Sequence, residues 1–362
     1  MSSPPRTPVS IITGFLGSGK TTLLNHVLAD PGMAGAAVII NEFGEIGLDH
    51  LLIATPNENT VLLASGCICC TVRGDLVDTL RDLDAKRRVG GIPPFDRVLI
   101  ETTGLADPVP IIQTVITDER LAPRFELDGV VTLVDAINGM TQLDCQPEAV
   151  KQAAVADRLL ITKTDLADPQ ILEALQQRLS RINPGALMQS VTQGQIDPAQ
   201  LFGATLRPRA RSAELARWLP EAAVARITDA PAHAHHHDDH IRAYCIYLDE
   251  PISAMGMTAW LTALASLRGA NLLRVKALLN VEGRPVAVHA VQTLIHEPVS
   301  LAQWPDDDRR SRLVFIARDM ARAEIEATLD VLRLKPTSQS DPPRQLDPRA
   351  YAQFVAAMNK VR

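Results

Sequence analysis

The segment Gly14–Thr21, which reads GFLGSGKT, constrains the fold more than any other part of this chain. An apolar run, Val9–Thr13, comes before it, and a stretch with the periodicity of a helix, Thr21–Ala29, comes after it. In a strand–loop–helix unit with the pattern G-x4-G-K-[ST], the glycines let backbone N–H groups surround phosphate oxygens, and the helix N-terminus adds partial positive charge. The sequence therefore predicts a phosphate-binding loop between a buried strand and a helix.

The residues of this loop have separate expected roles. Lys20 is expected to reach the β- and γ-phosphates of a nucleotide, where it is a candidate catalytic residue, and the Thr21 hydroxyl is expected to hold Mg²⁺. The other candidate nucleotide-binding residues of the loop are Gly14, Phe15, Leu16, Gly17, Ser18, Gly19 and Thr22.

Short β-branched runs alternate with helical stretches from residue 9 to about residue 205. Such alternation predicts an α/β fold, here a P-loop NTPase domain over residues 9–205, with a mostly parallel sheet flanked by helices. Sheets of this kind bind ligands at the carboxyl ends of their strands. The expected strands are Val9–Thr13, Ala37–Asn41, Val61–Ala64, Arg97–Glu101, Gly129–Val134 and Arg158–Thr162, and the expected helices are Thr21–Ala29, Val72–Arg88, Pro108–Thr117, Pro147–Ala156 and Pro169–Arg181.

A second, smaller set of strands and helices follows a proline-punctuated stretch. Residues 206–240 are predicted to form a linker, residues 241–334 a smaller α+β domain, and residues 335–362, rich in Pro, Ser and Gln, a flexible tail. Residues 1–8 are expected to be disordered. The second domain is expected to contain strands at Arg242–Leu248, Leu272–Val281, Pro285–Thr293 and Arg312–Ala317 and helices at Met257–Ser266 and Arg322–Leu334, with a short helix beyond it at Pro348–Val361.

The tetrapeptide Thr162-Lys163-Thr164-Asp165, at the end of an expected strand, indicates the base. It resembles the Asn-Lys-x-Asp signature of GTPases, in which the aspartate pairs with two N–H donors of guanine and the lysine stem lies against the base. Adenine lacks those donors, so ATP would leave the Asp165 carboxylate unpaired. Thr162 stands where the signature has asparagine and keeps one hydrogen bond. We therefore expect GTP to be preferred over ATP, with softer selectivity than the full signature gives.

Polar residues at two more strand ends are expected on the same rim. Glu101 ends the strand Arg97–Glu101, where its carboxylate is placed to hold Mg²⁺ through water or to order the attacking water. Gly104 is placed to bring its N–H to the γ-phosphate, so both are candidate catalytic residues. An ordinary strand-to-loop exit is the alternative. The segment Asn41–Glu45 follows another strand and is a candidate switch.

Three thiols lie between an expected strand and an expected helix, at Cys67, Cys69 and Cys70. Thiolates are soft ligands suited to Zn²⁺, Cu⁺ or Co²⁺, and a helix N-terminus lowers the pKa of a thiol toward the ligating form. Structural zinc sites use four closed ligands, so three thiolates leave one position open, which Glu42 or a water could fill. Such an open site suits a metal that must leave again. A redox dithiol and unrelated cysteines in a buried turn are the alternatives.

A histidine-rich run falls in the expected linker. It contains His233, His235, His236, His237 and His240, with two aspartates, and it is a compositional metal-binding tract that would exchange divalent ions quickly. A solvated polar linker is the alternative. The single histidines His289 and His296 are expected to be ordinary structural residues.

Composition excludes several classes of protein. The net charge of −6 argues against a general binder of nucleic acid or of a membrane surface, and no run of about 18 apolar residues is present to cross a bilayer. The five cysteines are an odd number, and three of them are clustered, unlike a secreted disulfide framework. We therefore expect a cytoplasmic protein with free thiols and with neither nucleic-acid nor membrane partners.

Taken together, these motifs resemble those of the CobW family of metal-trafficking GTPases. The resemblance covers roughly residues 8–330 and includes a histidine-rich segment between the two domains. The matching motifs, in chain order, are GFLGSGKTT, NEFGE, GCICC, ETTGLADP and TKTD, followed in the second domain by Leu273–Lys276 and Arg312–Arg318. The family has a P-loop domain of the SIMIBI class, and its zinc-transferring members hold Zn²⁺ on the C-x-C-C thiols, here Cys67, Cys69 and Cys70.

The resemblance implies a GTP-hydrolysing metallochaperone for Zn²⁺, or for Co²⁺, that passes its metal to a client metalloprotein. GTP and Mg²⁺ are the implied cofactors, and a homodimer is left open. One alternative is a GTPase that matures a cobalamin-dependent enzyme or nitrile hydratase, or serves cobalamin synthesis. Another is a metal buffer whose nucleotide is only structural. A small-molecule kinase is disfavoured, because no arginine-rich lid segment is apparent in the first domain.

Overall fold

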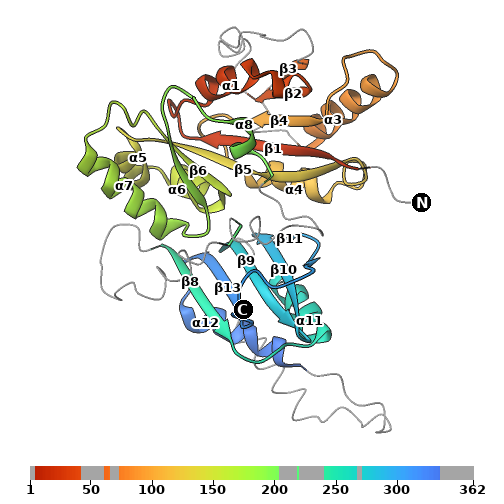
Figure 1. Ribbon diagram of the computed structural model, residues 1–362, viewed down its shortest axis with the longest axis vertical. Coiled ribbons are helices and arrows are strands. Elements are labelled where there is room, and N and C mark those ends of the chain that lie inside the picture. The colour runs from red at the N-terminus through yellow and green to blue at the C-terminus, as the bar shows by residue number, and fades with distance from the viewer. Residues whose placement is uncertain are drawn as a thin grey trace.

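The computed structural model describes residues 5–41, 61–65, 73–203, 218–219, 240–266 and 271–334. These residues form two β-sheets, one in each of two domains that lie against each other (Figure 1). Within the described residues, no helix is long and apolar enough to span a bilayer.

The first sheet has seven strands in the order β3-β2-β4-β1-β5-β6-β7, and every pairing is parallel. The phosphate loop follows its central strand, so the loop leaves the sheet where strands lie on both sides. The strands are β1 (Thr7–Gly14), β2 (Ala36–Asn41), β3 (Val61–Ser65), β4 (Arg97–Glu101), β5 (Phe125–Asp135), β6 (Arg158–Thr162) and β7 (Leu187–Val191).

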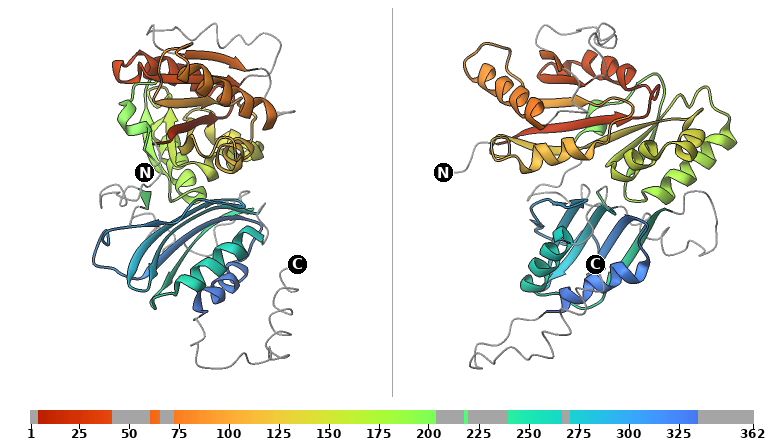
Figure 2. Two further views of the ribbon diagram at one scale, coloured as in Figure 1. Left: turned by 90° about the vertical axis from the view of Figure 1, so that its right-hand side faces the viewer. Right: turned by 180° about the vertical axis from the view of Figure 1, so that it is seen from behind.

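Helices cover both faces of this sheet (Figures 1 and 2). Alternate residues of a strand point to opposite faces: Ile11 packs in the cluster that contains α3 and α4, and Ile12 packs in the cluster that contains α1 and α8. The α/β fold with a parallel sheet flanked by helices is therefore confirmed. The helices are α1 (Lys20–Ala29), η1 (Pro31–Met33), α3 (Arg73–Arg88), α4 (Val109–Thr117), α5 (Gly139–Cys145), α6 (Pro147–Val155), α7 (Pro169–Ile182) and α8 (Pro198–Leu201).

The second domain is built on an antiparallel sheet with the order β11-β10-β9-β13-β8, and β12 pairs with β10. Helices α11 and α12 cover the face that is turned away from the first domain (Figure 2), with Trp260 edge-on to Phe315. This confirms the smaller α+β domain. Its elements are β8 (Ile241–Leu248), α11 (Ala254–Ser266), β9 (Leu272–Val281), β10 (Arg284–Val291), β11 (Leu294–Ile295), β12 (Val299–Ser300), β13 (Ser311–Arg318), α12 (Arg322–Leu329) and η3 (Asp330–Arg333).

The other face of the second sheet packs on the first domain. One buried cluster contains residues of α6 and α7 together with Leu273 of β9 and Ile316 of β13. Polar side chains of β9 cross the same boundary: Arg274 pairs with Asp157, and Lys276 donates to the carbonyl oxygen of Gly185 at 3.0 Å. The domain boundary is thus both apolar and ionic.

Two described residues of the stretch 206–240 also pack on this face. Trp218 and Leu219 belong to a buried cluster with Leu278 and Ala287 of the second sheet. The Lys276 ammonium donates to the carbonyl oxygen of Trp218 at 3.0 Å. This part of the expected linker is therefore attached to the second domain.

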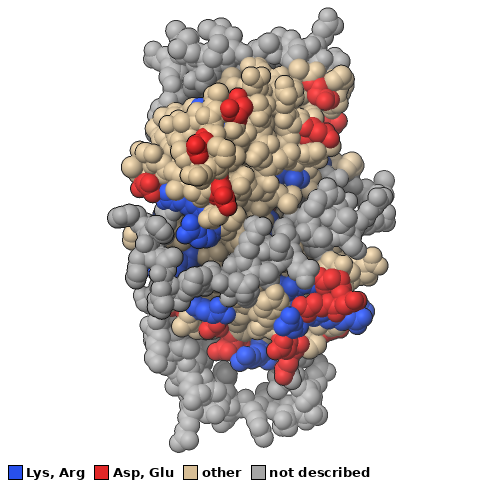
Figure 3. Space-filling view, turned by 60° about the vertical axis from the view of Figure 1, so that its left-hand side comes forward, with Lys and Arg blue, Asp and Glu red and all other residues tan. Residues whose placement is uncertain are grey.

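Charges on the second domain are balanced locally. Figure 3 shows acidic and basic side chains standing next to one another on one face of this domain. Among the ion pairs of this domain, Arg310 lies 3.0 Å from Asp308 and Arg312 lies 2.7 Å from Asp306.

Some expected element bounds were wrong. Strand β5 begins at Phe125 rather than at Gly129, because it continues through an irregular register opposite Val9 and Ser10. The expected helix Arg322–Leu334 is α12 followed by the 3₁₀ turn η3, and β10 stops at Val291 because Gln292 has a positive φ of 52°. Helix α5 and strand β7 were not expected at all.

Candidate nucleotide-binding site

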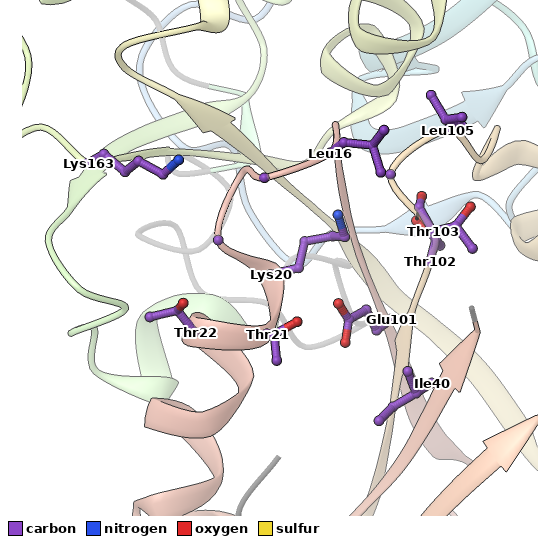
Figure 4. A pocket seen from close by; sticks show the side chains of 13 residues that line it. Leu16, Lys20, Thr21, Thr22, Ile40, Glu101, Thr102, Thr103, Leu105 and Lys163 are labelled. Carbon is purple, nitrogen blue, oxygen red and sulfur yellow. Dashed lines mark hydrogen bonds between the residues drawn. The ribbon is translucent and has the colours of Figure 1, made fainter. Parts of the chain in front are cut away.

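A pocket of about 590 Å³ lies at the carboxyl ends of β1, β2 and β4 (Figure 4). It brings together residues from four separate sequence motifs: the phosphate loop, the end of β2, the ETTG segment and the TKTD segment. Its walls are formed by Leu16, Gly17, Gly19, Lys20, Thr21, Thr22, Ile40, Glu101, Thr102, Thr103, Gly104, Leu105 and Lys163.

The phosphate loop has a backbone that requires glycine at two positions. A Cβ at Gly14 would lie 2.4 Å from the carbonyl oxygen of Leu133, so the loop and β5 approach too closely for any side chain there. Gly19, which caps α1, has a φ of 92°, in the left-handed region that favours glycine. Together these glycines let the loop curl around the N-terminus of α1, where backbone N–H groups are open to an anion.

Lys20 is the first residue of α1, and its side chain folds back over the loop. Its ammonium group donates to the carbonyl oxygens of Gly14, at 3.0 Å, and Phe15, at 3.3 Å. Phosphate oxygens carry full negative charge and are stronger acceptors than these carbonyls. The arrangement therefore holds the Lys20 charge at the pocket, ready to pair with a phosphate group.

Glu101 ends β4 on the opposite wall, and its side chain and that of Thr21 point toward each other (Figure 4). Glu101 is 3% exposed. Carboxylate and hydroxyl oxygens are suitable ligands for a hard divalent cation. Next to it, the hydroxyl of Thr102 donates to the Thr13 hydroxyl at 2.8 Å, which ties the end of β4 to β1.

Thr103 and Gly104 continue this wall. The hydroxyl oxygen of Thr103 is buried and has no hydrogen-bond partner within the described residues, so it is available to a bound ligand. A Cβ at Gly104 would lie 2.6 Å from the backbone nitrogen of Leu16, so glycine is required for this segment to touch the phosphate loop. The structure therefore brings Lys20, Glu101 and Gly104 to one pocket.

The TKTD segment begins at the end of β6, behind the phosphate loop. The Thr162 hydroxyl donates to the carbonyl oxygen of Ser18 at 2.8 Å, so this residue attaches the TKTD segment to the loop. Lys163 has a left-handed backbone, with a φ of 58°, and its ammonium group lies 2.7 Å from a carboxylate oxygen of Asp135. Asp165 is exposed.

Asp135, at the end of β5, was not among the expected site residues. Burial by itself raises the pKa of this carboxyl group, but hydrogen bonds from Lys163 and Asn138 outweigh it, so the pKa lies below its usual value. Asp135 is thus charged and fixes the Lys163 side chain. The acidic residue directly after the expected strand Gly129–Val134 was the available signal.

The loop after β7 was also missed. Thr192 lies 3.4 Å from Thr164, hydroxyl to hydroxyl. Gly194 has a φ of 76°, and a Cβ there would lie 2.8 Å from the carbonyl oxygen of Thr22 in α1. This loop therefore touches both the TKTD segment and the helix of the phosphate loop, which makes it a candidate wall for the base.

Most of the expected metal ligands lie outside the described residues: Glu42, Cys67, Cys69, Cys70, His233, His235, His236 and His237. His240 is described, and its Nδ1 lies 2.6 Å from Asp319 at the surface. Within the described part of the chain, no group of three or more His, Cys, Asp or Glu side chains could hold a metal ion. His289 and His296 are stacked at 4.3 Å between ring centroids beside the domain boundary.

Comparisons with known proteins agree with this architecture. Residues 8–190 match the family described as "CobW/HypB/UreG, nucleotide-binding domain", and residues 241–333 match the "Cobalamin synthesis protein cobW C-terminal domain". The chain is 37% identical to the zinc chaperone YjiA of Escherichia coli over 327 residues, which covers 90% of this chain and 98% of that protein.

Two further relatives extend the comparison. The zinc chaperone CobW of Pseudomonas aeruginosa is 28% identical over 365 residues, covering 90% of this chain and 91% of that protein. The crystal structure of the Zn(II)-bound YjiA GTPase from E. coli superposes with a TM-score of 0.67 and 31% identity, covering 91% of this chain and all of that one. On the strength of its two domains, its phosphate loop and these matches, the chain belongs to the CobW/HypB/UreG family of P-loop GTPases.

Proposed function

We propose that this protein is a GTP-hydrolysing metallochaperone that carries Zn²⁺ on the thiolates of Cys67, Cys69 and Cys70 and delivers it to a client metalloprotein. Glu42 is the proposed fourth ligand, and Co²⁺ is an alternative cargo for the same soft donors. The histidine run that ends at His240 is proposed to bind metal ions more weakly and to exchange them quickly.

The proposal for the nucleotide rests on the shape and donors of the pocket. A glycine-lined loop at a helix N-terminus, with the Lys20 ammonium beside it, suits a chain of phosphates. The Thr21 hydroxyl and the Glu101 carboxylate would hold Mg²⁺, which would neutralise charge on the phosphates when bound. Glu101 is also proposed to order the water that attacks the γ-phosphate, and Gly104 is proposed to donate its N–H to that phosphate.

One observation carries the link between the metal and the nucleotide: the register at the edge of the first sheet. Asn41 of β2 pairs with Ser65 of β3, and Ile40 pairs with Glu101 of β4. The chain therefore leaves β2, which neighbours the strand that ends in Glu101, toward Glu42, and it leaves β3, one strand farther out, toward Cys67. Two residues of chain span at most about 7 Å, which bounds the distance between the Cα atoms of Ser65 and Cys67.

The relatives support zinc as the cargo. The E. coli relative is named a zinc chaperone, and its GTPase was crystallised with Zn(II) bound. A relative from Schizosaccharomyces pombe, 36% identical over 197 residues that cover 52% of this chain and 47% of that protein, is named a zinc-regulated GTPase metalloprotein activator.

Coupling between the metal and the nucleotide is proposed to run through the segments that follow β2 and β4. In the proposed cycle, GTP orders the segments after β2 and β4, and hydrolysis releases them. If the metal affinity differs between those two states, then by linkage the metal changes the affinity for the nucleotide by the same factor. The metal is then released to the client in the state that holds it less tightly.

The test is GTP hydrolysis by the metal-free protein with and without one equivalent of Zn²⁺. It compares the wild type with a triple variant, Cys67→Ser, Cys69→Ser and Cys70→Ser. Cys145, an exposed free thiol on α5, provides the matched control Cys145→Ser. We expect Zn²⁺ to change kcat in the wild type and in the control, and to leave the triple variant unchanged.

Other outcomes identify the alternatives. Zinc binding to the three thiols without any change in kcat would indicate a metal buffer. A kcat for GTP that changes neither with Zn²⁺ nor with the cysteine substitutions would contradict the proposal. It would favour a GTPase that loads an organic cofactor or matures a metalloenzyme.

A further inference from the structure

Helix α6 lies against the segment that follows Glu101, although about 45 residues separate them in the sequence. Gln152 of α6 is 1% exposed, and its side-chain amide donates to the carbonyl oxygens of Gly104, at 3.2 Å, and Ala106, at 2.9 Å. Both neighbours are acceptors, so only the NH₂ end of the amide can face them. The amide oxygen is buried without a hydrogen-bond partner in the described structure. The two hydrogen bonds to Gly104 and Ala106 are therefore the polar contacts that this buried side chain makes in the described structure.

A second contact joins α6 to the same segment. Lys151 forms an ion pair with Asp107, and the other carboxylate oxygen of Asp107 accepts the backbone N–H of Val109 at 3.0 Å. Residues 104–107 are therefore held at both ends by adjacent residues of one helix.

The helix itself is firmly anchored. The Thr132 hydroxyl of β5 donates to the backbone oxygen of Gln152 at 2.9 Å. At the C-terminal end, the Asn183 side-chain amide donates to three carbonyls, those of Ala153, Ala154 and Ala156, at 2.9 to 3.1 Å. Arg274, from the second domain, donates to the carbonyl oxygen of Val155. A helix held to the sheet and to the second domain gives Gln152 a fixed position.

We propose that Gln152 is a positioning residue for GTP hydrolysis, which fixes the Gly104 segment against the phosphate loop, with Lys151 supporting it. The inference rests on the proposed function, since it takes Gly104 as a donor to the γ-phosphate. GDP lacks that phosphate. Loss of the Gln152 contacts therefore weakens binding of a GTP analogue and slows hydrolysis, while GDP binding is preserved.

The test uses the full chain with Gln152→Met, which keeps the length of the side chain and removes its donors. We expect kcat for GTP, measured without zinc, to fall about 10- to 100-fold, the range that a small misplacement of a catalytic group produces. We expect the affinity for GDP to change less than about twofold, and the affinity for the non-hydrolysable analogue GMPPNP to fall more than that for GDP. Lys151 is part-exposed, so Lys151→Met tests the same segment with little risk to folding. We expect kcat of this variant to fall by a smaller factor than kcat of Gln152→Met.

Gln177→Met on α7 is the matched control, because it removes the same kind of side-chain amide from an exposed residue whose amide, among the described residues, bonds only Glu173 of its own helix, at 3.4 Å. We expect it to keep both the melting temperature and, within about twofold, kcat. Variants of Gln152 and Lys151 that keep the wild-type kcat and the wild-type preference for GMPPNP over GDP would overturn the inference. Failure of the proposed zinc function would show instead in the wild type, as turnover indifferent to Zn²⁺.

Discussion

Arg274 of the second domain and Asp157 of the first form an ion pair that is buried in the boundary between the two domains. Arg274 is 2% exposed and Asp157 is 5% exposed. The second carboxylate oxygen of Asp157 accepts the backbone N–H of Val130 at 3.1 Å. Burial alone raises the pKa of Asp157, but the positive charges of Arg274 and Lys276 outweigh it, so the pKa lies below its usual value. The attachment of the two domains therefore depends on a charge that neither domain could bury alone.

Replacing Asp157 with Asn is expected to lower the free energy of unfolding by about 3–5 kcal/mol, because the Arg274 charge would stay buried without its counter-ion. Urea denaturation measures this loss. The exposed pair Arg322–Glu326, at 2.7 Å, supplies the control, and Glu326→Gln is expected to cost less than about 1 kcal/mol. Equal losses in the two variants would show that the buried pair has no special role.

Acidification is expected to destabilise the protein through the stacked histidines. Burial lowers the pKa of His296 to about 4 and that of His289 well below 6.5, with the charge of Arg274 adding to both shifts. Between pH 6.5 and about 4 the unfolded chain therefore binds protons that the folded chain does not, so stability is lost as the pH falls through this window. Each histidine contributes at most about 1.4 kcal/mol per pH unit.

Unfolding free energies measured at several pH values in that window check this expectation. His296→Gln should flatten the slope, whereas His26→Gln, which removes an exposed imidazole on α1, should keep it. A His296 variant with the full wild-type slope would assign the acid sensitivity to other groups.

Thr162→Val is expected to weaken GTP and GDP binding equally, by about 5- to 10-fold. The variant is close in shape and removes only the hydroxyl that donates to the Ser18 carbonyl, a net loss of roughly 1 kcal/mol. Isothermal titration of both nucleotides measures the change, and Thr117→Val on the exposed end of α4 is the control. A loss confined to GTP would place the effect at the γ-phosphate and contradict this explanation.

Gly194→Ala is expected to lower the affinity for guanine nucleotides about 10-fold, because its Cβ would meet the Thr22 carbonyl and push the loop after β7 away from α1. Gly283→Ala is the matched control: its φ of 85° is similar, but nothing lies within 4 Å of the added Cβ. Both variants pay about 1–2 kcal/mol for a left-handed backbone. Only Gly194→Ala should lower the affinity for guanine nucleotides. A similar loss of affinity in Gly283→Ala would show that the loss comes from reduced stability and not from the contact with α1.

The strands that run through the core could be predicted from the sequence, because most of their residues are apolar. Strand β9 was expected at Leu272–Val281 and has these bounds, and all ten of its residues are buried. Strand β7 is different: Leu187–Val191 lies at the edge of the first sheet, and only Val191 is buried, so it carries no apolar run. Helix α5 spans seven residues and begins at a glycine, which is too short and too weak a pattern to predict.

The residues of the pocket could be predicted only in part. Its phosphate loop, Glu101 and TKTD residues lie in contiguous motifs at strand ends, where chain order alone indicates their place. Gln152 and Asp135 act through partners 28 to 48 residues away, so only the folded chain shows what they touch. The same holds for Arg274, whose partner lies 117 residues away in the other domain.

The packing of Trp218 and Leu219 on the second sheet changes how the histidine run is tethered. Twenty residues separate Leu219 from His240, and His240 accepts the backbone N–H of Asp319 at 2.7 Å, also in the second domain. Both described ends of this segment thus lie in the second domain, and a chain of that length held at both ends reaches no farther than about 35 Å from them. Any metal ion that these histidines bind is therefore held within that distance of the second domain.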